Sequence, residues 1–151
     1  MNNQIEIHNK EAFNKMHNAG TLAAKVLDYI TQYVKKGVST GHLDDLCHDY
    51  IIKNHAVPAP LNYRGFPKST CISVNHVVCH GIPGDKILDE GDILNIDITV
   101  ILDGWYGDTS RMYFVGEPSK KAKFLTKITY ECLWLGIETV KPGSTTGDIG
   151  H

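Results

Sequence analysis

Hydrophobic and polar residues alternate strictly over residues 95–100, which is the pattern of a β-strand with one buried face. Its apolar residues are even-numbered, whereas Asp97 falls among the polar, odd-numbered positions. The Asp103-Gly104 pair that follows is a strong hairpin signal, because both residues tolerate a positive φ. Aromatic and β-branched residues then resume over residues 105–114, which predicts a returning antiparallel strand.

A two-residue turn at Asp103-Gly104 determines which residues of this predicted hairpin face each other. The expected opposite pairs are Leu102 with Trp105, Thr99 with Asp108, and Asp97 with Ser110. Opposite residues share a face of the sheet, and so do residues two apart along a strand. Asp97 and Asp108 are therefore predicted to be diagonal neighbours on one face, roughly 7 Å apart at the backbone.

Two carboxylates that converge beside apolar strands repel each other and lose hydration. A divalent metal between Asp97 and Asp108 would relieve both costs, and oxygen ligands favour manganese, magnesium or iron(II). The alternative is that both residues are ordinary solvated positions on an exposed sheet face, because aspartate is common near turns.

Apolar residues at three- and four-residue steps predict a helix from Glu11 to Lys36, with Gly37 at its C-terminal cap. A second helix is expected to begin at Ser39-Thr40, with the acidic residues Asp44 and Asp45 in its first turns. A third is expected from Ser119 through Ile137, and residues 144–148 have the pattern of a further helix N-terminus. The chain ends at residue 151, about one turn into that helix, so we expect a sequence that has been cut.

Residues 57–60 read V-P-A-P, which ends the second helix and introduces extended chain. The next segment, Leu61 to Cys71, is expected to be a loop because it contains Gly65 and Pro67. Its aromatic side chains, Tyr63 and Phe66, either pack locally onto the core or form the wall of an apolar pocket.

A short strand is predicted at Ile72–Val74, and the Asn75-His76 pair interrupts it. His80 then lies where extended chain gives way to a turn rich in glycine and proline. A histidine in such a place is either structural or reaches into a cleft.

The composition is that of an ordinary soluble globular domain: 151 residues, 42% hydrophobic and 21% charged, with a formal net charge of −2. This near-neutral balance gives no reason to expect a nucleic acid or an anionic membrane as partner. The four cysteines form no C-x-x-C pair, so neither a zinc finger nor a disulfide framework is expected. The first ten residues lack the pattern of a secretory signal, and we expect a cytoplasmic protein.

Three motifs in order carry a family resemblance: S-T-C-I-S-V-N-H-V-V-C-H-G-I-P, G-D-I-L-N-I-D-I-T-V and G-W-Y-G-D-T-S-R-M. They resemble type I methionine aminopeptidases, and the similarity runs from the first predicted helix to P-G-S-T-T-G-D-I-G. The resemblance implies an α+β "pita-bread" (creatinase/aminopeptidase-like) fold, in which two pseudo-symmetric halves enclose a dinuclear metal site. Residues 1–151 are then expected to be the N-terminal part of one catalytic domain, with an antiparallel sheet and flanking helices.

The resemblance also implies roles for individual residues. Asp97 and Asp108 look like two of five metal ligands, with Asp108 bridging two divalent ions, which are cobalt, manganese, iron or zinc. His80 looks like the residue that hydrogen-bonds the scissile amide or its tetrahedral intermediate. Tyr63, Phe66 and Cys71 look like part of the pocket for the methionine side chain. Asn75 and Val77 look like a sodium or potassium site that binds the ion through backbone carbonyls.

The implied activity is removal of the N-terminal methionine from nascent proteins by metal-activated water, with a small second residue preferred. The family is usually monomeric, and its substrates emerge from the ribosome. Departures from the family pattern are Phe66 for tyrosine, Pro60 for cysteine and Arg64 for histidine, and the last two are expected to affect the pocket entrance.

The family's other ligands, one histidine and two glutamates, belong to a second half outside these 151 residues. The chain alone is therefore expected to be inactive. One alternative is a truncated, non-catalytic half-domain that keeps only part of the metal site. Another is a related enzyme such as a proline-specific dipeptidase. The H-G-I-P motif and the loop from Leu61 to Cys71, called the pocket loop below, favour the methionine enzyme.

Overall fold

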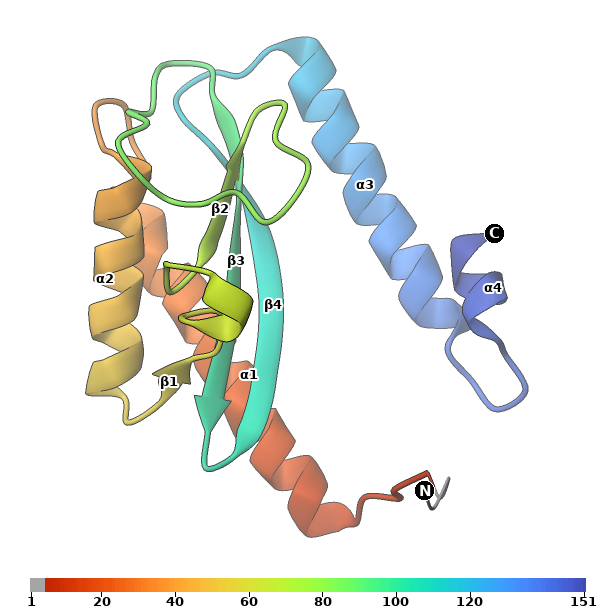
Figure 1. Ribbon diagram of the computed structural model, residues 1–151. Coiled ribbons are helices and arrows are strands. Elements are labelled where there is room, and N and C mark those ends of the chain that lie inside the picture. The colour runs from red at the N-terminus through yellow and green to blue at the C-terminus, as the bar shows by residue number, and fades with distance from the viewer. Residues whose placement is uncertain (1–4) are drawn as a thin grey trace. The chain divides into compact units, whose positions relative to one another are not determined.

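The computed structural model describes residues 5–151, which divide into a first unit ending at Gly116 and a second unit from Glu117 to His151. Figure 1 shows the elements in chain order. The first unit contains α1 (Lys10–Ile30), η1 (Thr31–Tyr33), α2 (Thr40–Lys53), β1 (Val57–Pro58), η2 (Tyr63–Gly65), β2 (Cys71–Val74), β3 (Ile93–Leu102) and β4 (Trp105–Phe114).

The central strand β3 pairs antiparallel with every other strand of the sheet. β4 covers one edge of β3, while β1 and β2 share the other edge at its two ends. The turn at Asp103-Gly104 has positive φ at both residues, 51° and 82°. All three predicted pairs are present, so the hairpin register is confirmed: Leu102 with Trp105, Thr99 with Asp108, and Asp97 with Ser110.

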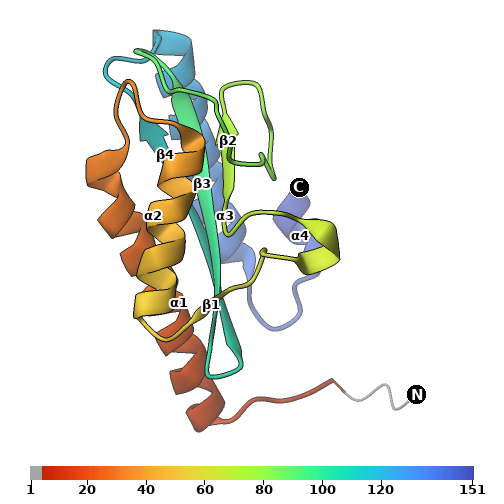
Figure 2. The same cartoon turned by 60° about the vertical axis from the view of Figure 1, so that its left-hand side comes forward.

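Helices α1 and α2 pack on one face of this sheet, and Figure 2 shows both on the side of β3 opposite η2. The predicted alternation is confirmed, because Ile96, Ile98 and Val100 are fully buried beneath these helices. The odd-numbered face of β3, which carries Asp97, points away from this core and is free to form a site.

A glycine allows α1 to approach β4 closely. A Cβ atom added to Gly107 would lie 2.2 Å from the carbonyl carbon and oxygen of Ala19 in α1. Ala19 is itself fully buried. Helix α1 therefore packs directly against the backbone of β4 at Gly107, the residue before Asp108.

The first helix ends earlier than the predicted boundary at Lys36. Its α-helical part stops at Ile30, a 3₁₀ turn follows, and Val34 is extended with φ −76° and ψ 94°. The backbone next pairs with a distant segment, since the N–H of Gly37 donates to the Leu88 carbonyl and the N–H of Leu88 donates to Val38. To reach that pairing the chain turns at residues 35–37, with Gly37 at φ +86°, where local periodicity predicts the last turn of a helix.

The second unit contains α3 (Lys120–Thr139) and α4 (Thr146–Gly150). The predicted N-cap is confirmed, because the Ser119 hydroxyl accepts a hydrogen bond from the Ala122 N–H at 3.1 Å. Thr145 and Asp148 form a capping box at the start of α4. Among residues 5–151, none of the helices combines the length and the apolar character needed to cross a membrane.

Candidate active site

A cavity of about 840 Å³ opens in the first unit, on the sheet face opposite α1 and α2. The structure brings together at this cavity six residues that the sequence singled out: Tyr63, Phe66, Cys71, His80, Asp97 and Asp108. These residues come from the loop after β1, from β2, from the turn after β2, and from both strands of the hairpin. Segments far apart in the chain therefore meet at one place.

The hairpin register places the two aspartates on the same face. Asp97 is partly buried and Asp108 is exposed. Burial raises the pKa of Asp97, the Asp108 carboxylate raises it further, and nearby His80 acts in the opposite direction. The ionised form of Asp97 is thus disfavoured by its surroundings, and a cation shared with Asp108 would favour it.

His80 occupies a backbone conformation that is rare for residues other than glycine, with φ +53°. Its neighbour Gly81 is held against β2, since its carbonyl accepts from the Ile72 N–H at 2.9 Å and its own N–H donates to the Ser73 hydroxyl at 3.1 Å. A Cβ atom on Gly81 would lie 2.2 Å from the Ile72 carbonyl oxygen. The strained turn therefore depends on a glycine directly after the histidine.

The pocket loop contributes aromatic rings to the cavity. Tyr63 is 64% exposed, and neither Tyr63 nor Phe66 belongs to the hydrophobic core. Both rings line the cavity, as the pocket-wall interpretation predicts and local core packing does not. Pro60 and Arg64 also line it, and the Arg64 guanidinium lies 5.4 Å from the centre of the Tyr63 ring.

Cys71 begins β2 and pairs directly with Asp97 on β3. Burial raises the pKa of the Cys71 thiol to about 11, and the neighbouring carboxylate of Asp97 adds to this shift. The thiol is therefore neutral at physiological pH and serves as a small, weakly polar part of the cavity wall.

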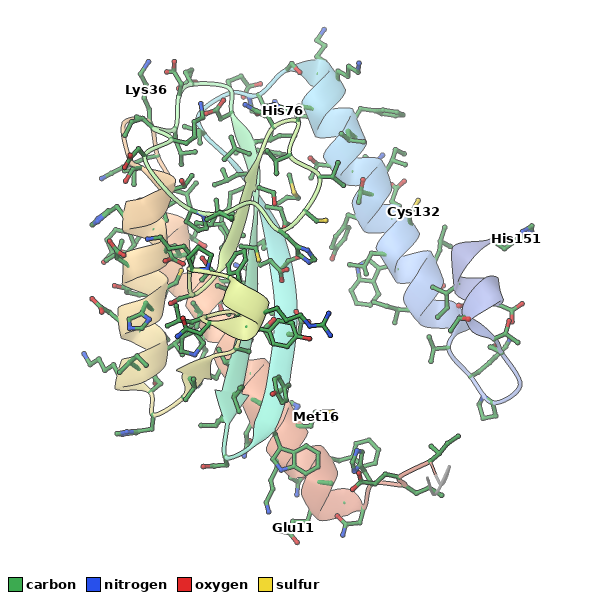
Figure 3. The ribbon with its side chains drawn as sticks, viewed as in Figure 1. Glu11, Met16, Lys36, His76, Cys132 and His151 are labelled. Atoms are coloured by element: carbon green, nitrogen blue, oxygen red, sulfur yellow. The ribbon has the colours of Figure 1, made fainter. Side chains whose placement is uncertain are left out.

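Asn75 and Val77, predicted to form a monovalent-cation site, do not line this cavity. They lie in the turn after β2, beside His76, which is labelled in Figure 3. The Asn75 side chain donates to Asp92 at 2.8 Å and accepts from the Ile93 N–H at 3.1 Å. This amide holds the turn, with Asn75 at φ +54°, against the start of β3.

Sequence reasoning missed several residues at and beneath the cavity. Thr99 and Tyr106 line it, and both could have been found by stepping two positions along the strands from Asp97 and Asp108. Asp44 was predicted to be a charge in the first turns of the second helix. It is instead buried, 3% exposed, beneath the pocket loop, and no local pattern signals such a role.

The donor set available for a metal is limited. Within residues 5–151, no group of three or more histidine, cysteine, aspartate or glutamate side chains converges where a metal ion could bind. Asp97 and Asp108 fit part of a hard-metal site, because they supply carboxylate oxygens and their mutual repulsion favours a cation between them.

Comparison with known proteins agrees with this arrangement. The model of metallopeptidase family M24 matches residues 14–151. The methionine aminopeptidase of Rickettsia prowazekii (strain Madrid E) is 60% identical over 147 residues, which cover 97% of this chain and 57% of that protein. A crystal structure of methionine aminopeptidase from Rickettsia prowazekii matches with a TM-score of 0.95 and 60% identity, covering 97% of this chain and 59% of that one.

An Xaa-Pro dipeptidase from Bacillus anthracis matches with a TM-score of 0.79 but only 21% identity, so it shares the fold alone. The pita-bread fold, with its antiparallel sheet and flanking helices, is thereby confirmed. The chain spans a little over half the length of these two methionine aminopeptidases.

Proposed function

The chain belongs to metallopeptidase family M24, and from this premise we propose that it acts in the removal of N-terminal methionine from peptides and nascent proteins. The observation that carries the proposal is the convergence of aromatic, histidine and paired aspartate side chains on one cavity. The 60% identity to a methionine aminopeptidase supports it.

In this proposal, Asp97 and Asp108 would be among the ligands of two divalent metal ions, which they would hold through carboxylate oxygens. The bound metal supplies Lewis-acid activation of the attacking water. The Asp97 carboxylate is partly buried, and the Asp108 carboxylate lies near it. Partial burial and the neighbouring negative charge both make the ionised form of Asp97 unfavourable, so a bound cation would stabilise it. The physiological metal is expected to be cobalt, manganese, iron or zinc.

His80 is proposed to donate a hydrogen bond to the scissile amide or to the oxygen that gains charge during attack. Its position on the cavity wall near Asp97 supports this role. The strained backbone at His80 is of the kind that persists where surrounding structure holds a functional side chain.

Tyr63, Phe66 and Cys71 are proposed to surround the methionine side chain of the substrate. Aromatic rings and a neutral thiol suit an unbranched, polarisable thioether. A small second residue is expected beside them, and Pro60 and Arg64 at the cavity are expected to modify which peptides enter. The carbonyls of Asn75 and Val77 are proposed to bind sodium or potassium outside the cavity.

We further propose that residues 1–151 form the N-terminal part of a single catalytic domain, acting as a monomer on chains that emerge from the ribosome in the cytoplasm. The match to 57% of the Rickettsia prowazekii methionine aminopeptidase supports the statement that these residues are part of a longer domain. Analytical ultracentrifugation tests whether the protein is a monomer, and a stable dimer would contradict the monomeric state.

A second candidate is a non-catalytic half-domain, which is favoured for the 151 residues alone because the described residues hold no cluster of three metal-binding side chains. Two carboxylates leave a metal largely hydrated and weakly bound. The chain alone is therefore expected to release no methionine.

The deciding experiment measures methionine release from a Met-Ala-Ser peptide with manganese or cobalt. Two proteins are compared: the 151-residue chain, and the same chain extended at its C-terminus by the part of the Rickettsia prowazekii relative that it does not match. Asp97→Asn should abolish release by the fusion, whereas Asp103→Asn, at the exposed hairpin turn, should leave it unchanged.

Release by the fusion that depends on Asp97 supports the methionine peptidase. No release by the fusion, or release that survives Asp97→Asn, contradicts it. Faster cleavage of an Xaa-Pro dipeptide than of Met-Ala-Ser would favour the proline-specific alternative. Release by the 151 residues alone would contradict their expected inactivity.

A further inference from the structure

The buried carboxylate of Asp44 on α2 makes several hydrogen bonds to the end of the pocket loop. Its Oδ1 atom accepts from the Ser69 N–H at 3.1 Å, from the Thr70 N–H at 2.8 Å and from the Thr70 hydroxyl at 2.8 Å. The Lys68 ammonium lies 3.7 Å from the other oxygen. Asp44 is only 3% exposed, so these bonds replace its water.

A second side chain from the same face of α2 reaches the same place. His48 lies one helical turn after Asp44, and its Nδ1 is 2.8 Å from the Ser69 hydroxyl. The helix therefore contacts residues 68–70 at two successive turns. These residues directly precede Cys71, the first residue of β2 and part of the cavity wall.

The rest of the loop is held mainly by bonds within itself. Asn62 N–H donates to the Phe66 carbonyl at 2.8 Å, and Phe66 N–H donates to the Tyr63 carbonyl at 2.9 Å. At its start, the Ala59 N–H bonds the Thr99 carbonyl of β3 at 2.9 Å. The loop is thus a small closed turn tied to the sheet at its start and to α2 at its end.

We propose that Asp44 is a positioning residue for the substrate pocket. By holding Ser69 and Thr70, it determines where the loop carries Tyr63 and Phe66 relative to Asp97 and Asp108. Asp44 touches neither substrate nor metal and acts only through the loop. That the cavity binds a substrate rests on the proposed function, whereas the control of loop position by Asp44 does not.

Amide hydrogen exchange on the 151-residue chain tests this directly. Asp44→Ala removes the acceptor, and exchange over residues 61–70 should accelerate at least about tenfold more than exchange over residues 94–100 of β3. Asp44→Asn keeps an oxygen acceptor but loses the charge, so its acceleration should be smaller. The matched control is Asp45→Ala, at the exposed neighbouring position, which should change neither segment.

Equal acceleration in the loop and in β3 would overturn the proposal, because Asp44 would then stabilise the whole fold and not the loop. Unchanged exchange in the loop would overturn it as well. If Asp44→Ala does not fold, the comparison of loop with strand in Asp44→Asn decides the matter by the same criterion.

Kinetics of the fusion protein provide the functional readout. A displaced pocket wall should raise KM for Met-Ala-Ser about fivefold or more in Asp44→Asn, with kcat changed less than about twofold. An unchanged KM would contradict positioning of the pocket. If the fusion releases no methionine, the proposed function fails, while the exchange measurement still decides the role of Asp44.

Discussion

Replacing Gly107 with alanine is expected to push α1 away from β4 and so to destabilise the first unit strongly. The new Cβ would lie 2.2 Å from the Ala19 carbonyl carbon and oxygen and 2.5 Å from the Gly20 nitrogen, whereas ordinary contacts begin near 3.4 Å. Overpacking a core typically costs ~1–3 kcal/mol, and we expect the upper end because both partners are backbone atoms. The midpoint of thermal unfolding should fall by roughly 10 °C.

The same helix offers a matched control. A Cβ added to Gly20 meets nothing within 4 Å, so Gly20→Ala should leave the packing intact and stabilise the chain by up to about 1 kcal/mol. Urea unfolding followed by circular dichroism measures both variants. A Gly107→Ala chain within about 0.5 kcal/mol of the parent would refute the close approach of α1 to β4.

Three further predictions concern the site and its support. Burial and Asp108 raise the pKa of Asp97, so the folded chain holds this proton more tightly than the unfolded chain, and ionisation destabilises the fold. Without metal, Asp97→Asn should therefore have a higher free energy of unfolding than the parent at pH values above the raised pKa, and this gain should vanish below the ordinary value of 3.8. Urea unfolding at several pH values measures the gain, and an equal gain at every pH would contradict the prediction. Gly81→Ala should displace the turn at His80, because its Cβ would lie 2.2 Å from a β2 carbonyl oxygen; an unchanged His80 ring NMR signal would contradict this. Tyr113→Phe should lower the unfolding free energy by about 1 kcal/mol, because the buried hydroxyl donates to an α1 carbonyl at 2.7 Å; urea unfolding tests this, and an unchanged midpoint would count against it.

The hairpin could be predicted in detail because its information is local. Strict alternation identified the buried face of β3, and the Asp103-Gly104 turn determined the register. Together they place Asp97 and Asp108 on one face from the sequence alone. Predictions of this kind succeed because a one-residue slip would move every apolar side chain of β3 to the opposite face.

Other features depend on contacts between distant segments. The end of α1 was misplaced because the chain at Gly37 and Val38 pairs with Leu88, which local periodicity does not reveal. Asp44 has the sequence signature of an ordinary helix charge. It is nevertheless buried, and its carboxylate accepts hydrogen bonds from residues about 25 positions later in the sequence. The predicted set of cavity residues came largely from a family resemblance and only in part from spacing.

The central claim is that Asp97 and Asp108 share a divalent metal. Manganese binding to the 151-residue chain, followed by the electron paramagnetic resonance of the free ion, tests it most directly. We expect weak binding to the parent chain, reduced at least about tenfold in Asp97→Asn and in Asp108→Asn but unchanged in Asp103→Asn. Equal binding by the parent and by a double variant lacking both site carboxylates would contradict the claim.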